Sequence, residues 1–140
     1  MLSRTAIHAI RALSRLSSLP AGTYAGAAEL AESIDAPRNY LGKLLQNLAA
    51  AGILESRKGT GGGFRLARAP ESISLYDVIE PIDRVSSWRG CFLGHATCSD
   101  DQPCCVHSRW GALRDQYLAF LSETTIAELD NDHPQPIDLG

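Results

Sequence analysis

The chain has 140 residues, a net charge of −3 and four cysteines, a length that suits a single domain of ordinary size. With 44% hydrophobic and 21% charged residues, its composition is that of a globular protein and excludes a disordered or fibrous chain. No apolar run approaches the roughly 20 residues that span a bilayer, so we expect no membrane segment.

The small net charge hides two halves of opposite sign. Residues 1–70 contain nine Lys/Arg and four Asp/Glu, a charge of +5, whereas residues 71–140 contain four Lys/Arg and twelve Asp/Glu, a charge of −8. A basic half joined to an acidic half predicts a module that binds a polyanion, followed by a regulatory or assembly module.

The first 28 residues contain three arginines and no acid, a composition shared with mitochondrial transit peptides. We favour the interpretation that this segment is the first helix of the domain and not a transit peptide, because its apolar residues follow helical spacing. No apolar stretch with a small-residue cleavage site is present, so we expect a cytoplasmic protein, in which clustered cysteines bind metal more often than they form disulfides.

Residues 26–34 predict a short second helix, and a turn at residues 35–37 leads into a third. Pro37 suits the first position of that helix, and Gly52 suits its end. Its apolar residues Leu41, Leu44, Leu45 and Leu48 form one helical stripe. The opposite face is polar and basic, so the two helices predict a helix-turn-helix.

Residues 53–58 and 64–67 predict a β-hairpin with a glycine-rich tip. A phosphate-binding P-loop is disfavoured, because the lysine and Ser/Thr pair is missing and a strand follows the glycines. A hairpin directly after a helix-turn-helix predicts a winged helix whose basic residues contact phosphates or the minor groove. The candidate DNA contacts are Arg38, Asn39, Tyr40, Lys43, Gln46 and Asn47 on the third helix, and Arg57, Lys58, Thr60 and Arg65 on the hairpin.

Ser74 predicts the cap of a helix over residues 75–82, and an aperiodic loop of about twenty residues follows. Helical periodicity resumes with a heptad-like seam, which predicts packing between two subunits and leaves packing on the chain's own core as the alternative. The seam consists of Val106, Trp110, Leu113, Tyr117 and Phe120. Residues 130–140 predict a flexible tail.

All four cysteines lie in or directly after this loop, in the pattern Cys91-x6-Cys98-x5-Cys104-x2-His107 with Cys105 beside Cys104. Structural zinc sites usually pair cysteines with about two to four residues between them, as in zinc knuckles. The gaps of six and five residues between these cysteines do not fit that spacing. Wider spacing in a long loop suits an iron–sulfur cluster. His107 is a candidate fourth ligand or a helix cap, and Cys105 is a bystander or a substitute ligand.

The chain resembles the winged-helix regulators of the IscR/NsrR type, the Rrf-two family, over residues 1–129. The matching motifs are Leu2-Ser3 with the Ala-rich helix, Tyr40-Leu41 with Leu44, Gly59-x-Gly61-Gly62-Gly63-Phe64, Ile73-x-Leu75-x-Asp77-Val78-Ile79, the three-cysteine loop and residues 124–129. The resemblance implies a homodimeric transcription factor, often a repressor, that binds a palindromic operator and senses iron–sulfur status, redox state or nitric oxide.

By position, the resemblance matches Cys91, Cys98 and Cys104 to three thiolate ligands, and His107 to the histidine ligand of the cluster-assembly regulators. Three departures stand out. The first cysteine gap is one residue longer than in those regulators, Lys58 replaces a frequent arginine, and Gly42 replaces a larger residue on the third helix.

We therefore expect a mainly α-helical protein with a small β-hairpin wing. The predicted parts are a winged helix-turn-helix domain (1–83), a cysteine-rich sensor loop (84–105), a dimerisation helix with its C-terminal segment (106–129) and the tail (130–140). The expected cofactor is a [2Fe-2S] or [4Fe-4S] cluster, with sensing through thiols or zinc, or without a cofactor, as the alternative. The expected partners are double-stranded DNA and a second copy of the chain, with no small-molecule substrate. We expect no enzymatic activity, since no oxyanion site or substrate pocket is indicated.

Overall fold

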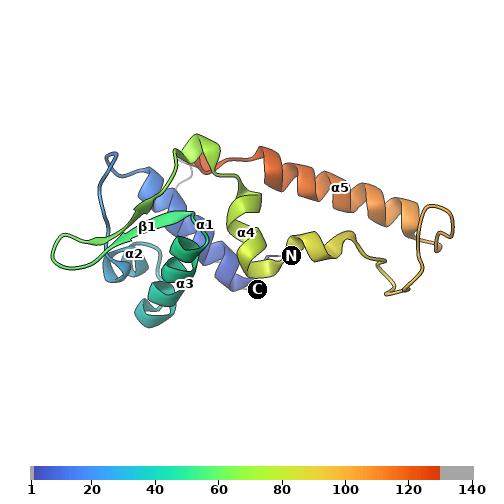
Figure 1. Ribbon diagram of the computed structural model, residues 1–140, viewed down its shortest axis with the longest axis horizontal. Coiled ribbons are helices and arrows are strands. Elements are labelled where there is room, and N and C mark those ends of the chain that lie inside the picture. Colours follow the sequence, from blue (N-terminus) through green and yellow to red (C-terminus); the bar gives the residue numbers. More distant parts are fainter. Residues whose placement is uncertain (1, 130–140) are drawn as a thin grey trace.

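The computed structural model describes residues 2–129, and its helices and hairpin follow the predicted order. A winged helix-turn-helix domain forms one end of the molecule, and a long arm extends from it (Figure 1). The elements of the domain are α1 (Arg4–Ser17), α2 (Ala27–Ser33), α3 (Arg38–Ala50), β1 (Leu54–Arg57), β2 (Gly63–Leu66) and α4 (Leu75–Asp83). The arm contains α5 (His107–Glu123), and short 3-10 turns are η1 (Pro70–Ser72), η2 (Val85–Arg89) and η3 (Ile126–Leu129).

The first helix is fixed at its start by contacts from both neighbouring and distant residues. The Ser3 hydroxyl caps α1 by accepting a hydrogen bond from the Ala6 N–H at 3.1 Å. The Ser3 backbone N–H donates to Oδ2 of Asp83, at the end of α4, at 3.0 Å. One stripe of α1, including Ala9 and Leu13, is buried in the core. The cap therefore joins α1 to α4 while the apolar stripe packs inward.

The predicted recognition helix α3 packs on the core through its apolar stripe. Leu41, Leu44, Leu45 and Leu48 are all buried, as their spacing predicts. Gly52 follows the helix with φ +81, a left-handed conformation that glycine adopts without steric cost. The chain therefore reverses immediately into β1.

The wing is an antiparallel hairpin in which Leu54 pairs with Leu66 and Arg57 pairs with Gly63. Ala25 and Phe64 exchange two backbone hydrogen bonds of 2.9 and 2.8 Å, so the segment before α2 adds a one-residue bridge to the hairpin. A Cβ on Gly63 would lie 2.2 Å from the carbonyl oxygen of Ala25, and its φ is +132. Only glycine permits this approach, because any side chain would collide with the bridging backbone.

The end of α5 and the residues after it return to the winged domain. The Leu75 N–H donates to the Thr124 carbonyl at 2.9 Å, and the Ile126 N–H donates to the Ile73 carbonyl at 2.9 Å. Leu121 and Ile126 are buried in the core. The C-terminal end of α5 is therefore fixed against the domain, and its N-terminal half projects away with the cysteine loop at the far end (Figure 1).

The chain after α4 contains more regular structure than its sequence predicts. The segment predicted to be aperiodic from residue 83 begins with a helical turn, η2, which is anchored because Val85 is fully buried. The predicted tail over residues 130–140 lies outside the described residues. Within residues 2–129, no helix is both long and apolar enough to cross a membrane.

Candidate functional site

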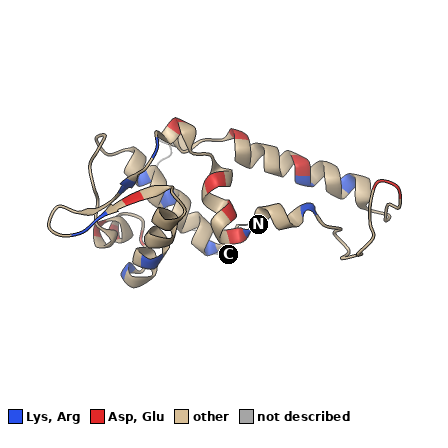
Figure 2. Cartoon of the chain, in the orientation of Figure 1, with Lys and Arg blue, Asp and Glu red and all other residues tan. Residues whose placement is uncertain are grey.

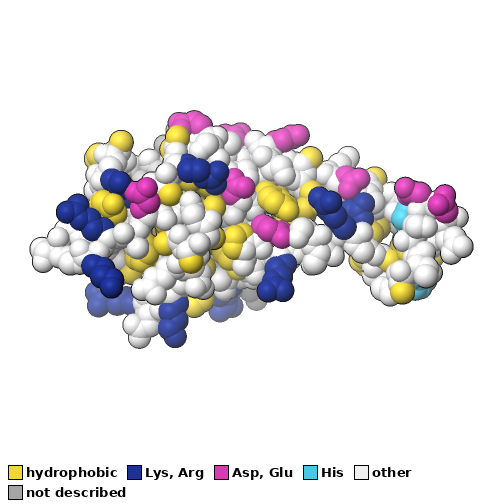
Figure 3. Space-filling view, viewed as in Figure 1, with side chains coloured by type: hydrophobic (Ala, Val, Ile, Leu, Met, Phe, Trp, Pro, Cys, Tyr) yellow, Lys and Arg dark blue, Asp and Glu magenta, His cyan; other side chains and the backbone are white. Residues whose placement is uncertain are grey.

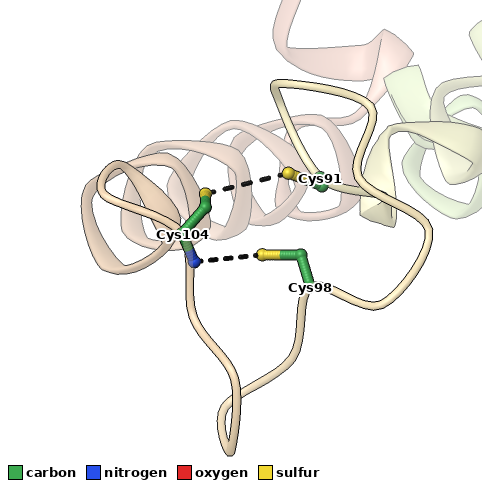
Figure 4. A group of neighbouring side chains, drawn as sticks. All are labelled: Cys91, Cys98 and Cys104. Atoms are coloured by element: carbon green, nitrogen blue, oxygen red, sulfur yellow. Dashed lines mark hydrogen bonds between the residues drawn. The ribbon is translucent and has the colours of Figure 1, made fainter.

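Three cysteines from separate parts of the loop converge at the start of α5. The Sγ atoms of Cys91, Cys98 and Cys104 all lie within 4.8 Å of one another, and those of Cys91 and Cys104 are 3.7 Å apart (Figure 4). The Cys104 N–H donates to Cys98 Sγ at 3.4 Å. The loop thus gathers the three thiols that the spacing of the sequence singles out; we call them the thiol triad.

His107, the first residue of α5, faces the thiol triad. Its Nδ1 lies 3.2 Å from Cys98 Sγ, and its Nε2 lies 2.9 Å from Oδ1 of Asp100. A carboxylate only accepts, so the Asp100 contact requires a proton on Nε2; in the neutral imidazole, the lone pair of Nδ1 then faces the thiols. The side chain of His107 is therefore directed at the triad and does not cap α5, whose N-cap residue, Val106, makes no side-chain cap bond.

Cys105 lies outside this arrangement. Its side chain is exposed, and it is absent from the group of thiols that could share a metal ion among residues 2–129. The geometry therefore supports the bystander assignment over the substitute-ligand assignment.

The triad favours unequal protonation of its thiols. The backbone N–H of His95 stabilises the Cys91 thiolate, desolvation opposes it, and the N–H of Leu93 and the neighbouring thiols add to the lowering of the Cys91 pKa to about 7. For Cys98, the Cys104 N–H also favours the thiolate, but desolvation and the adjacent Cys104 and Cys91 outweigh it and raise the pKa. Cys91 is therefore better prepared than Cys98 to deprotonate near neutral pH.

Two residues of α5 hold the chain just before Cys91. The Trp110 Nε1–H donates to the Gly90 carbonyl at 3.0 Å, and Arg114 Nη1 donates to the Arg89 carbonyl at 3.1 Å. Sequence reasoning did not assign these positioning contacts, because they join segments that are distant along the chain. A cavity of about 320 Å³ beside them is lined by the thiol triad, His107 and Asp100, among others.

The predicted dimerisation seam divides into two sets in the structure. The rings of Trp88 and Tyr117 are stacked with their centres 5.5 Å apart, and the ring centres of Trp110 and Phe92 are 5.3 Å apart. Trp110 and Tyr117 therefore pack against their own chain. Leu113 and Phe120 are 62% and 53% exposed. Val106 is half-buried at the helix start. The intrachain packing weighed as the alternative is thus observed for Trp110 and Tyr117, while Leu113 and Phe120 remain open to a partner.

Figure 2 shows Lys and Arg on α1, α3 and the hairpin, and Asp and Glu along α4, α5 and the tip of the loop. Further Lys or Arg residues lie on α5 and just before the loop, and an acidic residue lies on β1. The space-filling view shows Lys and Arg side chains around the edge of the domain that carries the hairpin and α3 (Figure 3). The predicted DNA contacts that are exposed are Arg38, Asn39, Lys43, Gln46, Asn47, Arg57, Lys58 and Thr60. This surface matches the polyanion-binding face expected from the charge of the first half.

Two of the predicted DNA contacts lie differently from the rest. Tyr40 is half-buried, its ring meets His8 of α1 edge-on at 5.6 Å, and its hydroxyl is buried without a hydrogen-bond partner among the described residues. Tyr40 therefore packs α3 against α1, and its assignment as a DNA contact stays a prediction. Arg65 is half-buried and forms an ion pair with Glu55 at 2.7 Å, so its charge is already compensated.

Comparison with known proteins shows which family this chain resembles in sequence and in structure. Residues 2–132 match the Rrf2 family, described as iron-dependent transcriptional regulators. The chain is 37% identical over 105 residues to an HTH-type transcriptional regulator of Aquifex aeolicus, covering 74% of this chain and 73% of that protein. It is 31% identical to the transcriptional regulator IscR of Vibrio atlanticus over 106 residues, covering 76% of this chain but 61% of the relative.

Solved structures share the fold at lower sequence identity. The global cysteine regulator CymR of B. subtilis superposes with a TM-score of 0.77 at 20% identity, covering 95% of this chain and 98% of that one. IscR of T. potens superposes with a TM-score of 0.75 at 21% identity, covering 100% and 93%. These likenesses confirm the predicted winged-helix fold, and the sequence matches establish that the chain belongs to the Rrf2 family, whose members are transcriptional regulators and not enzymes.

Proposed function

We propose that the chain is a homodimeric, cytoplasmic, DNA-binding repressor whose affinity for a palindromic operator depends on an iron–sulfur cluster held by Cys91, Cys98, Cys104 and His107. The observation that carries this proposal is the thiol triad, with the lone pair of His107 facing it. Relatives named IscR and the family description as iron-dependent regulators support it.

The residues fit a thiolate-bound metal group. Two thiolates on one tetrahedral metal at about 2.3 Å stand about 3.8 Å apart, and Cys91 and Cys104 are 3.7 Å apart. Three thiols and one imidazole give four donors, a set compatible with iron–sulfur ligation. When bound, the cluster would supply a centre that responds to redox state or nitric oxide.

The chain itself provides a connection from this site to the DNA-binding domain. Trp110 and Arg114 hold the backbone just before Cys91, and the same backbone continues into η2. η2 stacks Trp88 on Tyr117 of α5 and buries Val85 beside α4. A change in the order of the loop would therefore alter how α5 packs against α4 of the winged domain.

DNA binding would use α3 in the major groove and the wing on the backbone. In a symmetric dimer, two recognition helices contact half-sites about 34–36 Å apart, one turn of DNA, so a palindromic operator is expected. A pairing of two α5 helices through Leu113 and Phe120 would set this separation. Cluster binding would shift the protein between a state that binds the operator and one that does not. Moving this equilibrium from about 1:99 to 99:1 takes about 5.5 kcal/mol of difference in binding free energy between the two states.

A second function is favoured by the same donors. Three cysteines and one histidine also form a common tetrahedral zinc site, and the 3.7 Å thiol pair suits a single ion. In that case the protein would be a winged-helix regulator that senses through zinc or free thiols. Metal chemistry separates the two functions, because an iron–sulfur cluster contains sulfide and a zinc site does not.

The deciding experiment is anaerobic purification of the full chain, followed by a visible spectrum and analysis of iron, sulfide and zinc. We expect visible absorbance with iron and sulfide in the wild type, and loss of both in Cys98→Ala. Cys105→Ala is the matched control, since this thiol is exposed outside the triad. Zinc without sulfide would support the second function. A Cys98→Ala protein that keeps both its cluster absorbance and its cluster-dependent DNA binding would contradict the first.

A further inference from the structure

A tyrosine outside the helix-turn-helix lies against the charged face of the wing. Tyr24 directly precedes Ala25, the residue whose backbone bridges to Phe64 of β2. The guanidinium carbon of Arg65 lies 4.6 Å from the centre of the Tyr24 ring, and that of Arg57 lies 5.7 Å from it. Both distances are within the range of a cation–π contact, about 6 Å. One aromatic ring therefore contacts two cations from opposite strands.

The register of the hairpin explains how these groups meet. Glu55 pairs with Arg65 across the strands, and Arg57 lies two residues after Glu55, so the three side chains share one face. The other face carries Leu54 and Phe64, both of which are buried. The charged face is thus turned away from the core, and Tyr24 is the aromatic residue that lies against it.

The two arginines are not equivalent. Both Nε and Nη2 of Arg65 contact Oε2 of Glu55, at 2.8 and 2.7 Å, and this hydrogen-bonded pair raises the pKa of Arg65. Within the described part of the chain, no carboxylate lies within ion-pair distance of Arg57. Arg57 is exposed, and it is the last residue of β1 before the tip of the wing. Arg57 therefore carries the uncompensated charge of this group.

We propose that Tyr24 is a positioning residue of the DNA interface, which holds the Arg57 guanidinium ready for a DNA phosphate. The Arg65–Glu55 pair fixes the ring from the other strand and does not itself neutralise a phosphate. An arginine held in place before binding loses less conformational entropy when it meets its partner, so affinity is gained without a new contact. This inference rests on the proposed use of the wing in DNA binding.

The test compares Tyr24→Leu with the ring-conserving variant Tyr24→Phe in the full chain. The probe is a mixed-sequence duplex of about 30 base pairs, roughly three turns of DNA, with affinities measured over a series of salt concentrations. Tyr24→Leu should weaken binding about two- to fivefold, the range of an exposed cation–π contact, and Tyr24→Phe should bind like the wild type. The logarithm of the binding constant falls as the logarithm of the salt concentration rises, and Arg57→Gln should make this negative slope shallower by about one.

A double variant shows whether Tyr24 acts through Arg57. In the Arg57→Gln background, Tyr24→Leu should have no further effect. The paired replacement Glu55→Gln with Arg65→Gln should leave the salt slope unchanged, since it removes a compensated pair. The inference is overturned if Tyr24→Leu binds like the wild type, if Tyr24→Phe is equally weakened, or if Tyr24→Leu costs the same with and without Arg57.

A second measurement does not depend on DNA binding, and its deciding result comes from the wild type. The δ-protons of Arg57 in the wild type should show an upfield NMR shift from the Tyr24 ring, and Tyr24→Phe should retain it. Unshifted δ-protons in the wild type would overturn the stacking geometry. Absence of any salt-dependent DNA binding by the wild type would instead contradict the proposed function, and the NMR result would then decide the ring contact by itself.

Discussion

The Nδ1 atom of His107 lies 3.2 Å from the Sγ atom of Cys98. On the other side of the imidazole, Asp100 accepts from Nε2 at 2.9 Å and fixes the tautomer. His107 is only partly exposed, whereas the carboxylate of Asp100 is fully in solvent. The imidazole is therefore oriented towards the thiol triad, and in the proposed metal site Asp100 would act through it.

This arrangement predicts graded effects on metal affinity. His107→Ala removes a donor, and Asp100→Asn removes only its orienting partner, for which about a tenfold loss of affinity is expected. Zinc affinity of the metal-free protein, measured by competition with a chromophoric chelator, should fall more for His107→Ala than for Asp100→Asn. Asp101→Asn, at the neighbouring exposed carboxylate, is the control. Equal affinities for Asp100→Asn and Asp101→Asn would remove the orienting role.

Thiol reactivity should follow the unequal protonation of the triad. The pKa of Cys91 is lowered to about 7, while that of Cys98 is raised. In the reduced, metal-free protein, alkylation of Cys91 by iodoacetamide should reach half its maximal rate near pH 7 and that of Cys98 only at more alkaline pH, as followed by peptide mass spectrometry. In denaturant both should show the same profile. Identical profiles in the folded protein would contradict the asymmetry.

The two sets of aromatic and apolar residues on α5 should separate assembly from stability. Leu113→Glu combined with Phe120→Glu places charge on the exposed side chains, so the proposed dimer should dissociate while the helical content stays the same. Tyr117→Ala removes the stack on Trp88 and should lower the free energy of unfolding by about 1–3 kcal/mol. Ser122→Glu, also exposed on α5, is the control. Sedimentation that gives the same mass for the double variant and the wild type would rule out this face as the interface.

A buried histidine should make the winged domain sensitive to acid. His8 is 5% exposed, and burial, together with the charges of Arg11 and Arg4, lowers its pKa below the ordinary value of 6.5. Below about pH 6.5 the unfolded chain therefore binds the proton more readily than the folded chain, and the free energy of unfolding falls as the pH falls. Above that pH the contribution of neutral His8 is fully present.

Replacing His8 should weaken the pH dependence of the free energy of unfolding. Urea unfolding at about pH 7.5 and 5.5, on either side of the ordinary histidine pKa, should show a smaller loss of stability for His8→Phe than for the wild type. His95→Gln, at an exposed histidine, should behave like the wild type. The same loss in His8→Phe would show that other groups cause the acid sensitivity.

Much of this protein follows from local sequence patterns. The leucine stripe of α3, the Ser74 cap of α4 and the glycine-rich turn of the wing depend on neighbouring residues, so their periodicity and residue types predict them. The grouping of Cys91, Cys98 and Cys104 could also be predicted, because their clustering is itself a local feature.

Tertiary structure decided which faces have neighbours. A helical period places Trp110, Leu113, Tyr117 and Phe120 near one seam, yet only packing against η2 and the loop determines which of them are covered. In the same way, Tyr40 packs against His8, Glu55 compensates the charge of Arg65, and the Tyr24 ring contacts Arg57. The period of the apolar residues and the composition specify which residues share a surface. The energy of a side chain, however, depends on the groups that lie against it, and those groups come mainly from other elements of the fold.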